Sequence, residues 1–309
     1  MDNLTLSVIF PTRNAEWCLP YSLESLKNQT VQPQEILICV GKSEDRTEEI
    51  VLKFQKESIT PVRVFYDREG KGTGYAMNLL VSNATTDILL WASSDVVKPK
   101  NWIYTILNYY KEDPELVYLT TNELELDSKN IDKYLTINED TNINKIKYNK
   151  KNSIIISGLC SFKRKQAIAV GNFDPLFARG QDLDMTIRLV LSGARGGEKT
   201  PMGYHFGVYG TNNLKKAFKH GTYFKFVYKY GYKYILLLPH HTLAVVLRSS
   251  FLLSLMSFLV SLILFNQNIF YISIIWMLSS LLFILCGLYI THRKINSNLL
   301  LLQILGSLG

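Results

Sequence analysis

The sequence predicts an α/β fold with a mostly parallel sheet, because short apolar runs alternate with amphipathic segments along its first half. Strands are expected over 4–10, 35–40, 62–66 and 87–92, and helices over 17–28, 46–56 and 75–82. Residues 122–152 are rich in Asn and Lys and are expected to form an irregular insertion or a solvated helix pair. In such a sheet, ligands bind at the carboxyl ends of the strands.

Positive charge is concentrated near the C-terminal end. The formal net charge is +8 at pH 7, and no Asp or Glu follows Glu198. The basic residues there adjoin long apolar runs, so anionic lipid, and not nucleic acid, is the expected partner. The four scattered cysteines predict buried thiols without a disulfide framework or a metal cluster, and no cleavable signal peptide is expected.

Two uncharged runs, about 249–265 and 269–291, have lengths that predict a transmembrane helical hairpin. Basic residues lie before and after the pair, so the positive-inside rule predicts a multi-pass protein of the cell membrane with its N-terminal domain in the cytoplasm. The basic, aromatic segment 211–247 is expected to form interfacial helices. The alternatives are two buried helices in a soluble protein and, for the basic segment, a site for single-stranded nucleic acid.

Polar motifs follow the predicted strands in a regular order. They are Pro11-Thr12-Arg13-Asn14, Gly70-Lys71-Gly72 with Asn78, Ser93-Ser94-Asp95, Gly180-Gln181-Asp182 and, further on, His205. In this order the motifs resemble the family 2 glycosyltransferases with the GT-A fold, over about residues 5–232. The resemblance implies a GT-A catalytic domain over 1–210, interfacial helices over 211–247 and transmembrane helices over 248–309, as in enzymes that glycosylate polyprenyl phosphates or lipid-linked saccharides.

The resemblance also implies roles for particular residues. Asp182 matches the general base, which removes the proton of the acceptor hydroxyl. Asp184 is expected to orient Arg188 or to cap the following helix. The implied donor-binding residues are Pro11, Thr12, Arg13, Asn14, Lys71, Asn78, Ser94 and Asp95. The plainer alternatives are a strand-to-helix turn capped by Asn14 and an ordinary surface turn at Lys71.

The metal site departs from the family pattern. The family's Asp-x-Asp motif reads Ser93-Ser94-Asp95 here. The resemblance implies Mg²⁺ or Mn²⁺ held by Asp95, phosphate oxygens and water, with His205 as a further metal or diphosphate ligand. The alternatives are a ribose contact or a helix cap for Asp95 and a structural role for His205. Val40-Gly41 stands where the family often has an acidic residue for the nucleotide base, so the base stays open.

The implied activity is inverting transfer from a nucleotide-diphosphate sugar. The predicted anchor would hold the site at the cytoplasmic membrane face, and this position favours a polyprenyl phosphate or lipid-linked saccharide as the acceptor. One rival is a catalytically silent membrane protein that binds a nucleotide-sugar. Another is a nucleotidyltransferase, which needs a glycine-rich triphosphate loop with several basic residues near the first strand, where only Arg13 is present. The sugar, the acceptor and the oligomeric state stay open.

Overall fold

The computed structural model describes residues 4–121, 124–125, 131–136, 147–148, 161–177, 180–199, 203–206, 229–230, 250, 253–260, 262 and 267–292. The chain divides into two compact units, Met1–Gly207 and Val208–Gly309. The predicted interfacial segment 211–247 lies outside the described residues apart from 229–230, so its structure stays a prediction.

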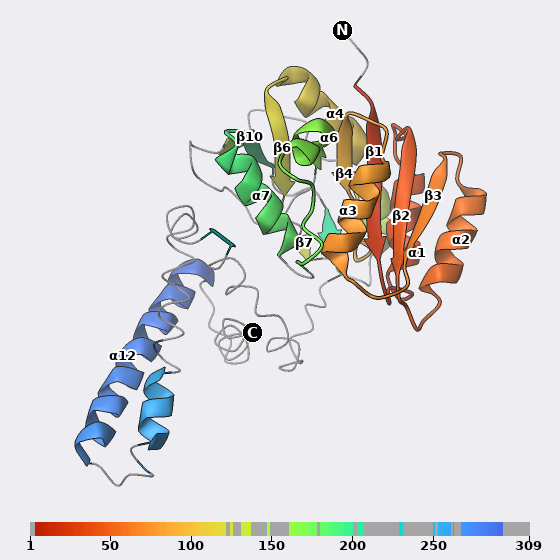
Figure 1. The fold of residues 1–309 in the computed structure, drawn as a ribbon. Coiled ribbons are helices and arrows are strands. Elements are labelled where there is room, and N and C mark those ends of the chain that lie inside the picture. The colour runs from red at the N-terminus through yellow and green to blue at the C-terminus, as the bar shows by residue number, and fades with distance from the viewer. Residues whose placement is uncertain are drawn as a thin grey trace. The chain divides into compact units, whose positions relative to one another are not determined.

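Four parallel strands form the first half of the sheet (Figure 1). They are β1 (Leu6–Thr12), β2 (Glu35–Gly41), β3 (Val62–Asp67) and β4 (Ile88–Trp91). β1 lies between β2 and β4, and β3 pairs with β2. The α/β class and the mostly parallel sheet are therefore confirmed.

Four more strands extend the sheet in the order β3-β2-β1-β4-β9-β6-β10-β8. Their bounds are β6 (Leu116–Thr121), β8 (Lys147–Tyr148), β9 (Ser161–Lys163) and β10 (Arg195–Lys199). β9 is antiparallel to both neighbours, and β10 is parallel to β6. A second, three-stranded sheet joins β5 (Val96–Val97), β11 (Tyr204–His205) and β7 (Leu124–Glu125). This small sheet brings a late segment of the chain beside the end of β4.

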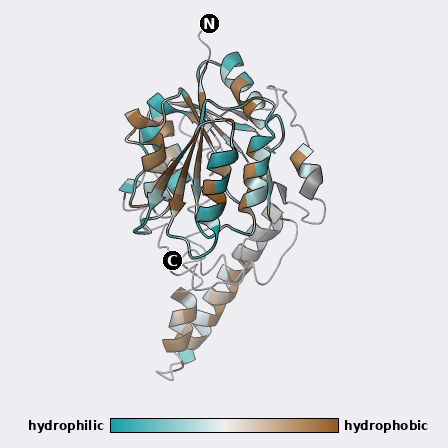
Figure 2. Cartoon of the chain, turned by 90° about the vertical axis from the view of Figure 1, so that its right-hand side faces the viewer, coloured by the Kyte–Doolittle hydropathy of each residue, from teal (hydrophilic) through white to brown (hydrophobic). Residues whose placement is uncertain are grey.

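Helices cover both faces of the first four strands. The helices of this unit are α1 (Leu19–Lys27), α2 (Thr47–Glu57), α3 (Thr73–Asn83), α4 (Trp102–Glu112), α5 (Ile131–Thr136), α6 (Arg164–Ala169) and α7 (Gln181–Leu191). Apolar residues of α1, α2 and α4 share one core cluster with alternate residues of the strands, whereas α3 packs against β1 and β2 with its own buried residues. Because both faces of β1, β2 and β4 are buried, these strands are almost continuously apolar, as their brown colour shows (Figure 2), whereas the edge strand β3 is partly exposed.

β1 extends past residue 10, where the sequence predicts the end of the first strand. β1 continues to Thr12, and Pro11 pairs in register with Cys39 of β2. The Ile9 carbonyl accepts a hydrogen bond from the Ala92 amide, so the backbone groups of Ile9 face β4. Those of Pro11, two residues later, face the same side, but β4 has already ended at Trp91. Pro11 lacks an amide hydrogen, but β4 does not extend far enough to accept a hydrogen bond there, so β1 accommodates the proline.

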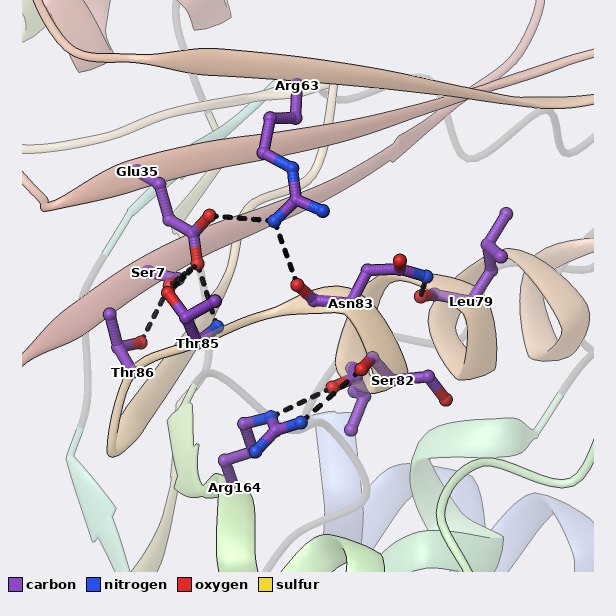
Figure 3. A network of polar contacts seen from close by, with 10 residues as sticks. Ser7, Glu35, Arg63, Leu79, Ser82, Asn83, Thr85, Thr86 and Arg164 are labelled. Atoms are coloured by element: carbon purple, nitrogen blue, oxygen red, sulfur yellow. Dashed lines mark hydrogen bonds and ion pairs between the residues drawn. The ribbon is translucent and has the colours of Figure 1, made fainter.

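A polar network ties the strands together near Glu35, the first residue of β2 (Figure 3). The Glu35 carboxylate accepts hydrogen bonds from the Ser7 hydroxyl, from the amide and hydroxyl of Thr85, and from Arg63. Arg63 also donates to the carbonyl of Asn83. The network satisfies a carboxylate that is 7% exposed and joins β1, β2, β3 and the loop before β4.

The second unit contains a helix over 253–260 and α12 (Gln267–His292). Ser257 and Ser273 are hydrogen-bonded at 2.8 Å, and Phe258 packs on Phe270. No helix within the residues that the structure describes is long and apolar enough to cross a membrane. The two predicted spans are therefore not confirmed. Cys18 and Cys39 of the first unit are buried free thiols, as predicted.

Candidate active site

A cavity of about 240 Å³ opens where β1 to β4 end. Five of the predicted donor-binding residues lie around it: Pro11, Thr12, Arg13, Ser94 and Asp95. The other lining residues are Cys39, Gly41, Asp67, Gly72, Thr73, Ala76, Trp91 and Ser93. The cavity thus joins loops that are far apart in sequence at the carboxyl edge of a parallel sheet, where a ligand site is expected.

Thr12 and Arg13 both line this cavity. The Thr12 side chain is 5% exposed, and its hydroxyl has no hydrogen-bond partner among the described residues. A buried hydroxyl without a partner costs free energy, so a bound ligand that pairs with it gains affinity. The Arg13 side chain lies over Gly41, where a β-carbon would come within 3.2 Å of the Arg13 β-carbon. Gly41 therefore makes room for Arg13 at the place where the family often has an acidic residue.

Asp67 was not predicted from the sequence. It is the last residue of β3 and is 4% exposed. Its carboxylate accepts hydrogen bonds from the backbone amides of Lys71 and Gly72, which shapes the loop before α3. The Lys71 side chain does not line the cavity and instead pairs with Glu69 at 3.0 Å. Asp67 could have been predicted, because it is an acidic residue directly after a predicted strand.

Asn14 and Asn78 have structural partners in the described residues. The Asn14 backbone amide donates to the Ser43 hydroxyl, and the Asn14 side-chain oxygen accepts a hydrogen bond from the Glu44 backbone amide. These two bonds join the loops after β1 and β2. Asn78 donates to the carbonyl of Phe173 at 2.7 Å. Neither lines the cavity, so nothing in the geometry supports their predicted contact with the donor.

Asp95 and His205 form the clearest chemical pair. His205 Nε2 lies 3.2 Å from Asp95 Oδ2, and the Asp95 side chain is 43% exposed. β11 sets the distance, because His205 pairs with Val96 and the Phe206 amide donates to the Asp95 carbonyl. Burial tends to raise the pKa of Asp95, but the hydrogen bond and charge of His205 outweigh it, and the pKa is lowered. Asp95 is therefore ionised at neutral pH.

This pair suits a divalent cation. A carboxylate oxygen and an imidazole nitrogen that face each other at 3.2 Å offer two adjacent ligands. No group of three or more His, Cys, Asp or Glu side chains is arranged for a metal within the described part of the chain. Phosphate oxygens and water would have to complete the coordination.

Asp182 lies in the first turn of α7, after Gly180, which has a left-handed backbone. Burial raises the pKa of Asp182 and outweighs its hydrogen bonds to backbone amides, which act in the opposite direction. Asp184 differs, because it is fully buried and pairs with Arg188 at 2.5 Å, as one of its predicted roles required. Asp182 does not line the cavity, and its predicted role as general base stays a prediction.

Known proteins resemble this chain in sequence and fold. Residues 7–170 match the model of "Glycosyl transferase family 2". The glucosyltransferase WfgD of Escherichia coli, named as acting on α-D-GlcNAc-diphosphoundecaprenol, is 30% identical over 95 residues, which are 31% of this chain and 36% of the relative. A dolichyl N-acetyl-α-D-glucosaminyl phosphate glycosyltransferase of Methanococcus voltae is 32% identical over 119 residues, 36% of each chain. The matches thus span about a third of these relatives' length.

Solved structures share the fold at low identity. Mannosyltransferase PcManGT of Pyrobaculum calidifontis, solved with GDP-Man and Mn²⁺, aligns with a TM-score of 0.59 and 16% identity over 98% of this chain and 85% of its own. TarS 1–349 of S. aureus with UDP aligns with a TM-score of 0.53 and 16% identity over 69% of this chain and 63% of its own. Because the family model covers more than half of the residues, the chain belongs to glycosyl transferase family 2.

Proposed function

We propose that this protein transfers a sugar, with inversion, from a nucleotide-diphosphate sugar to a polyprenyl phosphate or lipid-linked saccharide. One observation carries the proposal: Asp95, which is paired with His205, lines a strand-end cavity together with Thr12 and Arg13. The names of similar proteins support the choice of donor and acceptor class. WfgD is named with UDP-Glc as donor and a diphosphoundecaprenol acceptor, and the Methanococcus voltae relative is named with a dolichyl phosphate acceptor. TarS 1–349 was solved with UDP.

Each residue has a distinct part in this mechanism. Thr12 and Arg13 bind the donor nucleotide in the cavity. When the acceptor is a lipid-linked saccharide, Asp182 takes the proton of its hydroxyl while the hydroxyl oxygen attacks the anomeric carbon, and the bond from that carbon to the diphosphate breaks on the opposite face. A polyprenyl phosphate would attack through an ionised phosphate oxygen and would not need this proton transfer. The raised pKa of Asp182 supports this role, because it gives the carboxylate a higher proton affinity than an exposed aspartate has.

Asp95 and His205 would hold Mg²⁺ or Mn²⁺ together with the donor diphosphate. A bound ion supplies positive charge that stabilises the leaving diphosphate. The carboxylate of Asp95 and, once it has lost its proton, the neutral imidazole of His205 are what this protein contributes to that site.

We further propose that the second unit attaches the enzyme to the cell membrane, with the catalytic domain in the cytoplasm. In the two helices that the structure describes there, serines lie at buried positions and large apolar residues lie at exposed ones. Ser254 and Ser273 are fully buried, whereas Met256, Ile272 and Ile275 are each more than 60% exposed. Small inward residues with hydrogen bonds between helices are typical of helix pairs in lipid.

Thermal denaturation with a panel of nucleotide-sugars, with and without Mn²⁺, tests donor binding. A stabilising donor is then incubated with polyprenyl phosphate or a lipid-linked saccharide, and the anomeric configuration of the product is read by NMR. We expect one donor class to stabilise the protein and the product to have the opposite configuration. Retention of configuration would exclude the single-displacement route through Asp182.

A further inference from the structure

A lysine is buried behind the loop that carries Asp95. Lys98 follows β5 directly and is 1% exposed. Its ammonium group lies 5.1 Å from the centre of the Phe10 ring, in the strand that leads to Pro11 and Thr12. Neither the family resemblance nor the mechanism above uses this residue.

The Lys98 ammonium contacts the loop of the site directly. Nζ donates to the carbonyl of Ser93 at 2.6 Å and to the hydroxyl of Ser22 at 2.5 Å. The Ser22 hydroxyl donates to the same Ser93 carbonyl at 2.9 Å. The three groups form a closed triangle in which one carbonyl receives two hydrogen bonds.

Burying an ammonium group is costly unless the group is well hydrogen-bonded. A buried apolar side chain in the same place avoids that cost, so simple packing is a poor reason for a lysine here. The carbonyl that accepts the hydrogen bond of Lys98 belongs to Ser93, the position at which the family's metal motif has its first carboxylate. The next two residues, Ser94 and Asp95, line the cavity.

We propose that Lys98 is a positioning residue that holds the Ser93 carbonyl and so fixes the Ser93-Ser94-Asp95 turn for binding the donor diphosphate and its metal ion. The proposal rests on the proposed function. The turn is then held from two sides, by Lys98 and Ser22 through Ser93 and by β11 through the Phe206 amide on Asp95. Because the motif has a single carboxylate, the direction of Asp95 matters more for binding the ion than it would in a motif with two.

The test compares Lys98→Met with Gln29→Met. Gln29 is a fitting control because it is 6% exposed and joins the same elements, donating to the carbonyls of Ser25 and Pro99, yet no contact with Ser93 is found. Both variants are assayed below their unfolding transitions. We expect both to lower the Tm and only Lys98→Met to lower the kcat of transfer, by about 100-fold, since small displacements of catalytic groups have effects of that size. The KM for the acceptor is expected to be unchanged.

A binding measurement separates positioning from general stability. Calorimetry of UDP and GDP with and without Mn²⁺ gives the gain in affinity that the metal provides, and Lys98→Met is expected to lose that gain while Gln29→Met keeps it. If Lys98→Met fails to fold, Ser22→Ala decides, because it removes one of the two hydrogen bonds to Ser93 and is expected to lower kcat about 3- to 10-fold. Equal kcat and equal metal gain in the variant and its control would overturn the proposal. If the wild-type protein binds nucleotide with metal but transfers no sugar, only the proposed function is overturned. The calorimetric comparison of Lys98→Met with Gln29→Met then still tests the role of Lys98.

Discussion

His205 Nε2 lies 3.2 Å from Asp95 Oδ2, although more than half of the catalytic unit separates the two residues in sequence. The antiparallel pairing of β11 with β5 accounts for this, since it places His205 beside Val96, the residue after Asp95. Two strands of two residues each thus bring a late histidine to the end of an early strand. The predicted metal ligands therefore meet, and the pair can be tested as a unit.

Asp95→Ala should abolish the effect of Mn²⁺ on nucleoside diphosphate binding, because the ion would keep only His205, phosphates and water as ligands. Calorimetry of UDP and GDP, with and without Mn²⁺, measures this. Glu69→Gln is a suitable control, because Glu69 is 75% exposed and lies outside the cavity lining. A metal effect that survives in Asp95→Ala, or is absent from the wild type, would contradict the metal role of Asp95.

Asp182→Asn should lower kcat about 100- to 10,000-fold, the usual loss for a general base, and leave donor affinity nearly unchanged. Asp184→Asn, two residues on, should instead lower stability and leave kcat nearly unchanged. It leaves Arg188 without its buried partner, so the free energy of unfolding is expected to fall by about 3 kcal/mol. Turnover numbers and denaturation curves of the two variants distinguish these outcomes. An Asp182→Asn enzyme with more than about a tenth of wild-type turnover would rule out the general-base role.

The pH dependence follows from the same carboxylate. Because burial raises the pKa of Asp182, kcat should fall, as the pH is lowered, at a higher pH than the ordinary aspartate pKa of about 3.9. Protonation removes the base, so activity is lost below that pKa. A kcat profile between pH 3 and 8 in the wild type locates this acidic limb, and a limb at the ordinary aspartate pKa would contradict the assignment.

Glu35 should make the stability of the fold pH-dependent in acid. Burial acts to raise its pKa, but hydrogen bonds from Thr85, Ser7 and Arg63 outweigh it, and the pKa is lowered. The native state therefore binds its proton less readily than the unfolded chain, whose Glu pKa is about 4.3. The stability that Glu35 contributes is present above that value and is lost as the pH falls through the lower pKa of the folded state.

Glu35→Gln should remove this acid-dependent loss and lower the stability at neutral pH. Urea unfolding of the wild type and the variant between pH 3 and 7 measures both effects. Glu49→Gln is the control, because the Glu49 side chain is 65% exposed and its pair with Arg46 lies on the helix surface. Parallel stability curves for the wild type and Glu35→Gln would show that the network in Figure 3 has no such role.

The sequence predicted the strands and the cavity better than the individual contacts. Apolar runs located β1 to β4, and the carboxyl edge of a parallel sheet located the site. Asn14, Lys71 and Asn78 do not line the cavity. Their side chains pair with other residues, in contacts that depend on the folded structure. Asp67 and Lys98 were missed because their contacts depend on the fold. Asp67 accepts hydrogen bonds from two backbone amides, and Lys98 donates to the Ser93 carbonyl and the Ser22 hydroxyl.

The membrane prediction can be tested on the full-length protein. If the two C-terminal helices lie in lipid, membranes that contain the protein should retain it in high salt and at alkaline pH, since buried apolar helices do not depend on charge for binding. Replacing both Ile272 and Ile275 by Lys should release it, because each lysine costs about 3 kcal/mol at the centre of a membrane helix. Both side chains are 65% exposed on α12 and point away from the serine contacts with the other helix. Ser273→Ala changes the inward face of the same turn and should stay bound. Donor binding by the released variant shows that the catalytic unit is still folded. Release of the wild-type protein by salt alone would mean that 249–291 does not span, and the lipid-linked acceptor would lose its physical support.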